Sequence, residues 1–211
     1  LWSIGIWMSR MTYVSADEVQ DICSRLRAEK YPCDVIHLDT GWFETDWLCE
    51  WKFNKERFPN PEGFIQGLLR QGFKTSLWQL PYVAEGAEQI EEARANNYIA
   101  PLTKKQESEG SNFSTLDYAG TIDFTDPEAT EWYKGLRRQL LKRGVKGIKT
   151  DFGENIHMDA VYKNMTPEQL NNLYALLYQK AAYEVTKEVT GDGIMWARAA
   201  WAGCQRYPLH W

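Results

Sequence analysis

Hydrophobic residues along the chain gather in five short runs that alternate with longer segments of helical periodicity. The runs are rich in β-branched and aromatic residues, which is typical of buried strands. They cover residues 4–9, 35–40, 74–79, 147–152 and 194–199. Repetition of strand and helix in this way favours parallel strands joined by right-handed crossovers. The pattern therefore predicts an α/β fold built on a parallel sheet.

Helical segments follow four of the five runs, and their ends carry capping residues. The first has apolar residues at i, i+3, i+4 and i+7, which are Val19, Ile22, Cys23 and Leu26. Ser15 and Glu18 are expected to form a capping box at its start. Each later helix should begin with a capping residue followed by proline and should stop at a glycine. These helices are expected from Asn60 to Gly72, from Asp126 to Gly144 and from Thr166 to Gly191.

Polar and polar-tipped side chains stand late in the predicted strands. A doubly wound nucleotide-binding fold is expected to show a Gly-x-Gly-x-x-Gly fingerprint after its first strand, and residues 4–18 contain none. Functional side chains gathered at the carboxyl ends of successive strands are typical of a (β/α)8 TIM barrel. The residues in such positions are Asp39, Trp78, Gln79, Asp151 and Arg198.

Five strands do not close such a barrel, so the chain is expected to be a fragment holding about the first five β/α units. We expect residues 1–211 to form one partial barrel with a loop insertion at about 82–125. Its polar tract TKKQESEGSNFS, from Thr103, is expected to be a mobile loop at the barrel mouth. The start LWSIGIWMSR and the end RYPLHW suggest that both termini are cuts through a larger, multidomain protein.

Composition narrows the class of protein and its partners. With 44% hydrophobic and 25% charged residues among 211, the chain is an ordinary globular sequence. A net charge of −5 without a basic block argues against nucleic acid as a partner. There is no run of 18 apolar residues, so no membrane span is expected. The four cysteines lack CxxC spacing and are interpreted as reduced thiols, which favours a cytoplasmic location.

Lys149 and Asp151 lie two positions apart in a predicted strand, so both side chains point to the same face. Unpaired buried charges are costly, and the pair therefore needs an explanation. Three interpretations stay open: Asp151 is a nucleophile kept ionised by Lys149, the two residues form a structural salt bridge, or Lys149 forms a Schiff base with substrate.

The other strand-end residues also allow more than one interpretation. Asp39 is either a site carboxylate or a turn and N-cap residue. Arg198 pairs with a carboxylate or binds a substrate hydroxyl. His37 is interpreted as a core histidine, since no other ligand falls at metal-binding spacing, and no metal is expected. Together with Trp78, these groups suit a neutral polyhydroxylated ring, because the polar groups bind hydroxyls and the indole covers the apolar C–H face.

The segment GIKTDFGE, residues 147–154, resembles the nucleophile motif of glycoside hydrolase family 31. Further motifs follow in the order found in that family: GIWMSR, HLDTGWF, RFPNPEGF, LWQLPY, IDFTDPEA and ARAAWAGCQRYPLHW. The resemblance thus covers nearly the whole chain. It implies a TIM-barrel hydrolase, a retaining α-glycosidase that needs no cofactor and acts on an oligosaccharide or glycoside through a covalent intermediate.

The resemblance also implies roles for individual residues. Asp151 would be the nucleophile, and Asp39 would bind hydroxyls of the sugar in the −1 subsite. Lys149 and Arg198 would support the same ring, while Trp78 would form part of the pocket wall.

A second carboxyl group is needed to protonate the leaving oxygen and to activate water. In the family this acid/base is an aspartate shortly after the His-Trp pair that here is His210 and Trp211, so it is expected just after Trp211, outside this chain. Glu154 is expected to orient the loop after the nucleophile.

The sugar specificity is inferred from Thr40-Gly41-Trp42, which follows Asp39 and looks like the α-xylosidase branch of the family. In the α-glucosidase branch an Ile-Asp pair usually stands here. We therefore expect α-xyloside hydrolysis, with α-glucosides and sulfoquinovosides as rival substrates. A non-catalytic sugar-binding fragment is the alternative from another class, and a homo-oligomeric assembly is left open.

Overall fold

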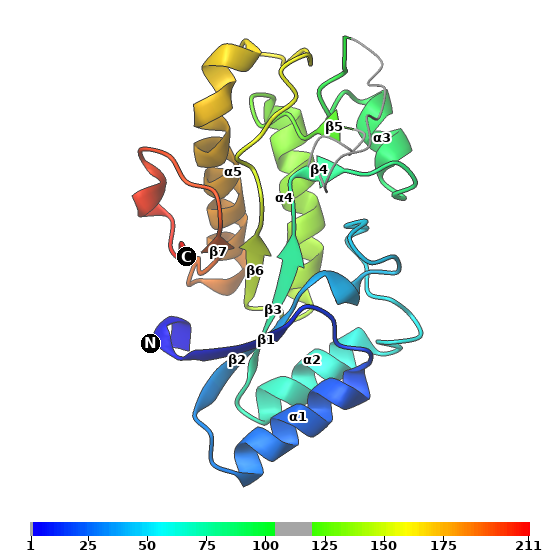
Figure 1. Cartoon of the computed structure of the whole chain (residues 1–211), viewed down its shortest axis with the longest axis vertical. Coiled ribbons are helices and arrows are strands. Elements are labelled where there is room, and N and C mark those ends of the chain that lie inside the picture. The colour runs from blue at the N-terminus through cyan, green and yellow to red at the C-terminus, as the bar shows by residue number, and fades with distance from the viewer. Residues whose placement is uncertain (1, 104–119) are drawn as a thin grey trace.

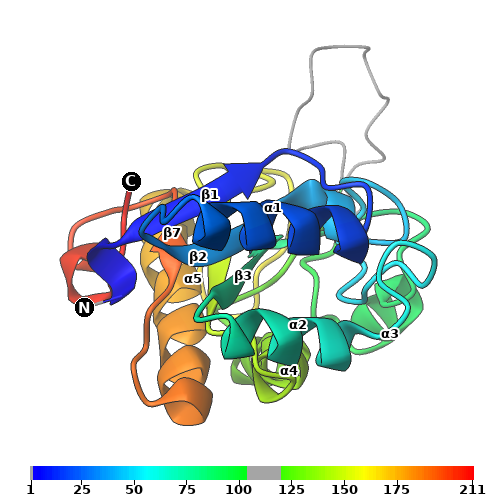
Figure 2. The same cartoon turned by 90° about the horizontal axis from the view of Figure 1, so that it is seen from below.

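The computed structural model describes residues 2–103 and 120–211, and its centre is a five-stranded sheet. All neighbouring strands pair in parallel, and their order in the sheet is their order along the chain. The strands are β1 (Ile6–Arg10), β2 (Cys33–Leu38), β3 (Lys74–Gln79), β6 (Gly147–Thr150) and β7 (Trp196–Ala197). The sheet is curled, as Figures 1 and 2 show, so the expected partial (β/α)8 barrel is confirmed.

Four long helices cover the outer face of this sheet (Figures 1 and 2). They are α1 (Ala16–Ala28), α2 (Pro61–Arg70), α4 (Pro127–Lys142) and α5 (Pro167–Thr190). The side chains of Asn60, Asp126 and Thr166 cap the last three, as predicted. Side chains alternate along the strands, so Ile36, Leu77 and Ile148 are buried in the core beneath the helices. The alternate residues, such as His37, Trp78 and Lys149, face the concave side.

The predicted capping box of α1 is only half formed. Ser15 accepts a hydrogen bond from the Glu18 backbone amide, as expected. The Glu18 carboxylate instead binds the Val14 amide at 2.7 Å and the Arg10 guanidinium at 2.6 Å. The ion pair with the end of β1 draws the side chain away from the Ser15 amide, so the prediction of a complete box was wrong.

The region between β3 and α4 contains regular structure in its described parts. β4 (Tyr82–Val83) pairs antiparallel with β5 (Gly120–Thr121), and α3 (Ile90–Ala95) lies between them in sequence. Figure 1 places these elements at the end toward which the arrows of β3 and β6 point. The tract predicted to be a mobile loop lies, beyond Thr103, outside the described residues.

The two ends of the described chain lie near each other, beside β1 and β7 (Figure 1). Trp2–Ile4 forms a 3-10 turn, so β1 starts two residues later than predicted. Residues 208–211 run next to β7, where Ala197 bonds the backbone of Leu209 and Trp211. In the described residues no helix is long and apolar enough to cross a bilayer, and all four cysteines are buried free thiols.

Candidate active site

Five side chains converge at the carboxyl ends of β2, β3, β6 and β7. The Lys149 ammonium lies 3.1 Å from Asp151 Oδ2 and 3.3 Å from Asp39 Oδ2. Trp78 Nε1 donates to Asp151 Oδ2 at 2.6 Å, and Arg198 Nη1 lies 3.4 Å from Asp151 Oδ1. The structure thus brings together all five residues for which the sequence predicted a role in the site.

The Asp151 carboxylate is the centre of this cluster. Its Oδ2 accepts from Trp78 and forms an ion pair with Lys149, and its Oδ1 accepts from Arg198 and, at 3.0 Å, from the Phe152 amide. Its side chain is only 9% exposed. A buried carboxylate needs paired charges and hydrogen bonds to offset the loss of water, and these partners supply them. The predicted ion pair exists, but it is one part of a larger constellation.

The backbone after Asp151 turns sharply. Phe152 has φ +55° and Gly153 has φ +90°, both in the left-handed region that non-glycine residues avoid. A Cβ atom on Gly153 would lie 2.8 Å from Cδ1 of Tyr178, so glycine is needed there on two grounds. The turn aims the Phe152 amide at the carboxylate. It is a local distortion at a cluster of charges, which is where functional strain is usually found.

Glu154 and Arg198 form the outer edge of the cluster. Arg198 Nε donates to the Glu154 carboxylate, and its guanidinium lies 4.3 Å from the centre of the Phe152 ring. Glu154 therefore fixes the direction of the arginine that reaches Asp151. Its expected role in orienting the loop after Asp151 stays a prediction.

Asp39 combines the two interpretations that the sequence left open. It caps the 3-10 helix Thr40–Trp42 by accepting from the Thr40 amide at 3.1 Å, and its other oxygen binds Lys149 and His37. Burial raises the pKa of the Asp39 carboxyl, but the hydrogen bond from His37, the charge of Lys149 and the hydrogen bond from the Thr40 amide outweigh it. The net result is a pKa below the ordinary value, so Asp39 is an anion at neutral pH.

His37 holds the Asp39 carboxylate, a contact that the sequence pattern did not reveal. It is fully buried, as a core histidine should be, with Nδ1 2.9 Å from Ser76 Oγ and Nε2 3.0 Å from Asp39 Oδ2. Burial lowers its pKa, so the ring is neutral and Nε2 donates to Asp39. The available signal was the spacing of two residues between His37 and Asp39, which puts both on one strand face.

His37 is expected to make folding stability depend on pH. Its pKa is below 6.5 in the folded state, so the unfolded chain binds the extra proton as the pH falls. The stabilising contribution is complete above pH 6.5 and is lost as the pH falls through the lowered pKa. The measurement is the free energy of unfolding of the full-length protein in urea at several pH values. Below pH 6.5, its increase with pH should be smaller in His37→Gln than in the wild type, by up to about 1.4 kcal/mol per pH unit. An unchanged slope would contradict this assignment.

Aromatic rings complete the concave side of the site. The Lys149 ammonium lies 5.2 Å from the Trp196 ring centre and 4.8 Å from that of Trp211. Trp47 contacts the edge of Trp78 at 5.4 Å. These contacts hold Lys149 by cation–π attraction and offer flat apolar surface next to charged groups. Trp196 could have been predicted, because it lies two residues before Arg198 on the same face.

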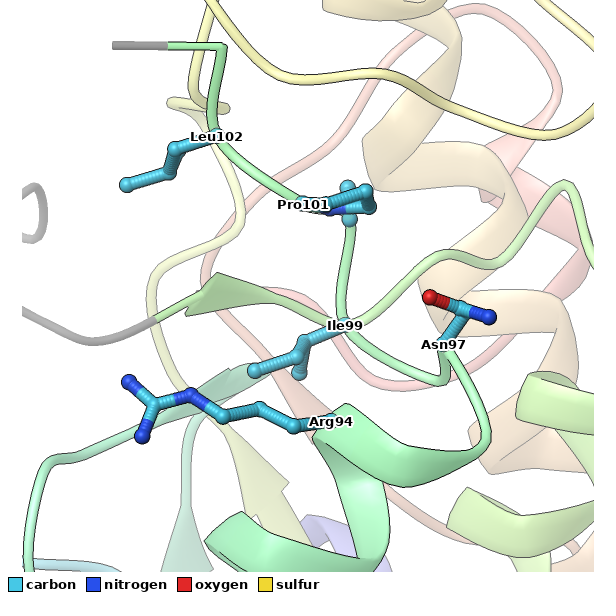
Figure 3. Close-up of a pocket in the computed structure, with 6 residues that line it drawn as sticks. Arg94, Asn97, Ile99, Pro101 and Leu102 are labelled. Atoms are coloured by element: carbon cyan, nitrogen blue, oxygen red, sulfur yellow. The ribbon is translucent and has the colours of Figure 1, made fainter. Parts of the chain in front are cut away.

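A separate hollow of about 320 Å³ lies beside α3, and Figure 3 shows its lining. The lining residues are Arg94, Asn97, Ile99, Ala100, Pro101 and Leu102. None of the five clustered residues contributes to it, and Arg94 pairs with Glu85. Within the described ranges, no three His, Cys, Asp or Glu side chains are grouped to hold a metal ion. The carboxylate cluster is therefore the better candidate for an active site.

Comparison with known proteins gives a consistent picture. Residues 1–211 match the family model described as the glycosyl hydrolases family 31 TIM-barrel domain. The chain is 32% identical to an alpha-xylosidase of Emericella nidulans, covering 100% of the chain and 27% of that protein. It is 33% identical to alpha-xylosidase XylQ of Lactiplantibacillus pentosus, with 94% of this chain and 26% of that protein covered. It is 30% identical to a sulfoquinovosidase of Escherichia coli, with 76% of this chain and 24% of that protein covered. The chain thus spans about a quarter of these relatives.

Among solved structures, the chain is similar to a family 31 dextranase of Flavobacterium johnsoniae complexed with glucose. The TM-score is 0.85 at 27% identity, with 100% of this chain and 27% of that chain covered. The fold described above is therefore similar to that of part of this enzyme.

Proposed function

This chain belongs to glycosyl hydrolase family 31, and from that premise we propose that it forms part of the catalytic barrel of a retaining α-glycosidase. The observation that carries the proposal is the Asp151 carboxylate, which is held by Lys149, Arg198 and Trp78 at the carboxyl edge of the sheet. A carboxylate that is largely buried and held by several partners has the fixed orientation that a nucleophile needs.

Asp151 would act in two displacements. In the first, one of its oxygens forms a bond to the anomeric carbon while the glycosidic C–O bond breaks, and the leaving oxygen takes a proton from a general acid. In the second, water attacks the same carbon, the bond to Asp151 breaks and the proton from water returns to the acid group. Two inversions at one carbon leave the product with the configuration of the substrate.

Neighbouring residues would supply position and charge. Lys149 and Arg198 would hold the Asp151 carboxylate in position for attack. Asp39 would bind hydroxyls of the sugar, and more tightly as the ring flattens toward the transition state. We place the acid/base on an aspartate shortly after Trp211, as the resemblance implies. Glu154 is not assigned this role, since its carboxylate is bound to Arg198.

We propose an α-xyloside as the substrate. The support is the Thr40-Gly41-Trp42 sequence after Asp39 and the similarity to two alpha-xylosidases. The rivals are α-glucosides and sulfoquinovosides, whose rings carry an additional substituted carbon.

The test compares 4-nitrophenyl α-xyloside, α-glucoside and α-sulfoquinovoside with the full-length protein. We expect kcat/KM to favour the xyloside by about 10- to 200-fold, the range for one extra group in a pocket. Proton NMR of the first product should show the α-anomer. A higher kcat/KM for another of the three sugars would show that the proposed substrate is wrong. Binding of these glycosides without turnover of any of them would support a sugar-binding protein instead.

A further inference from the structure

The helix-facing side of the sheet carries a buried polar network directly behind the Asp151 backbone. Its members are Gln79 at the end of β3, Tyr133 and Arg137 on α4, and Tyr178 on α5. All four are fully buried. Polar groups in a core are unfavourable unless they are bonded to one another, so such a network needs a structural or functional reason.

Two members bond the backbone of Asp151, one at its amide and the other at its carbonyl. The Asp151 amide donates to the Gln79 carbonyl at 2.9 Å, and the Tyr178 hydroxyl donates to the Asp151 carbonyl at 3.3 Å. Nε2 of Gln79 in turn donates to the Tyr178 hydroxyl at 2.7 Å. Gln79 therefore fixes the proposed nucleophile through its own backbone and through the tyrosine that it orients.

The network continues away from the site to a buried arginine. Gln79 Nε2 and Arg137 Nη1 each donate to the Tyr133 hydroxyl at 3.2 Å. Arg137 also bonds the Ile148 carbonyl and the Thr186 hydroxyl, which ties α4, β6 and α5 together. Burial raises the pKa of Tyr178 and raises that of Tyr133 to about 12, so both hydroxyls keep their protons as donors.

The residue after Tyr178 makes a parallel connection. Gln179 accepts from the Thr150 hydroxyl at 2.6 Å and donates to the Ala199 carbonyl at 3.3 Å. Ala199 follows Arg198, whose amide bonds the Thr150 carbonyl. Consecutive residues of α5 thus hold the backbone at Asp151 and next to Arg198, and Figure 1 shows α5 running alongside β6 and β7.

Tyr178 also packs under the strained turn that follows Asp151. Its ring occupies the space where a side chain on Gly153 would lie. Without the hydrogen bond from the Tyr178 hydroxyl, the Asp151 amide would keep its strand bond to Gln79. The Asp151 carbonyl would lose the contact that resists its rotation. A displacement of about 1 Å at a reacting group can lower a rate by about 100-fold.

We propose that Tyr178 is a positioning residue for the reaction, acting from α5 on the carbonyl of Asp151, with Gln79 orienting its hydroxyl. The inference rests on the proposed function, because it takes Asp151 as the nucleophile. Tyr178 does not contact the substrate; it fixes the direction from which the carboxylate attacks.

The test is Tyr178→Phe in the full-length protein, with active sites counted by trapping with a 5-fluoro glycosyl fluoride. Per titrated site, kcat should fall by about 10- to 100-fold, while KM changes by less than about twofold. The matched control is Tyr174→Phe, one turn earlier on α5. Tyr174 is equally buried, but its hydroxyl bonds the carbonyls of Ile122 and Pro81, so kcat should be retained whatever happens to the melting temperature.

Gln79→Leu is the second variant, and it decides the matter if Tyr178→Phe yields no titratable sites. Its kcat should also fall by at least about 10-fold, because the Tyr178 hydroxyl loses its orienting donor. The inference would be overturned if kcat per titrated site were unchanged in whichever of Tyr178→Phe and Gln79→Leu folds. It would also be overturned if Tyr174→Phe lost as much kcat. Either result would leave the proposed function intact. If the wild-type protein neither turns over a glycoside nor is trapped, the proposed function fails and the inference fails with it.

Discussion

Asparagine in place of Asp151 is expected to lower kcat of the full-length protein by about 10⁴-fold or more, the usual cost of losing a nucleophile. The amide has nearly the same shape, and its one oxygen can still accept from either Trp78 or the Phe152 amide, so the backbone of the site should stay in place. It lacks the charge needed to attack the anomeric carbon. The measurement is steady-state hydrolysis of an aryl α-xyloside, normalised to folded protein.

Two companions separate chemistry from folding in this experiment. Asp192→Asn changes an exposed carboxylate that is bonded to Trp2 and is not part of the cluster, and it should keep wild-type kcat. Asp151→Gly should regain turnover with azide, which attacks in place of the carboxylate and gives a glycosyl azide of inverted configuration. Activity of Asp151→Asn above about 1% of wild type would exclude Asp151 as the nucleophile.

Methionine in place of Lys149 is expected to lower kcat/KM by about 10²- to 10³-fold, the range for losing one preorganised electrostatic contact. The Lys149 ammonium is shared by the carboxylates of Asp39 and Asp151. Its charge is one of the causes that lower the pKa of the Asp39 carboxyl, so that pKa should rise in the variant. Because the Asp39 anion then forms only at higher pH, the acidic limb of the kcat/KM profile should move to higher pH.

Lys146→Met is the matched control, because Lys146 lies just before β6 and is not part of the charged cluster. Its pH profile should be that of the wild type. An acidic limb that does not move in Lys149→Met would show that the lysine does not lower the pKa of Asp39. A Schiff-base role is disfavoured by the same geometry, since an imine at Nζ would have to break both ion pairs.

Much of the fold could be predicted because it depends on local patterns. Buried parallel strands leave short apolar runs, and the helices carry capping residues that bond their own backbone. The site residues were equally accessible, because a period of two places Lys149 and Asp151 on one face and because strand ends meet at one edge of the sheet.

The remainder depends on contacts that no local pattern records. β4 and β5 have two residues each, too few for a periodicity, and α3 has six. The half-formed capping box at Ser15 reflects the pull of Arg10 from outside the helix. Arg137 reads as a surface residue of an amphipathic helix, yet it is fully buried through bonds to α5 and β6.

Trapping tests the central claim most directly. The full-length protein is incubated with a 5-fluoro α-xylosyl or α-glucosyl fluoride, digested, and examined by peptide mass spectrometry. The account predicts one glycosylated peptide that contains GIKTDFGE, with the sugar esterified to Asp151, and no such peptide from Asp151→Asn. A sugar attached to any other residue would contradict it.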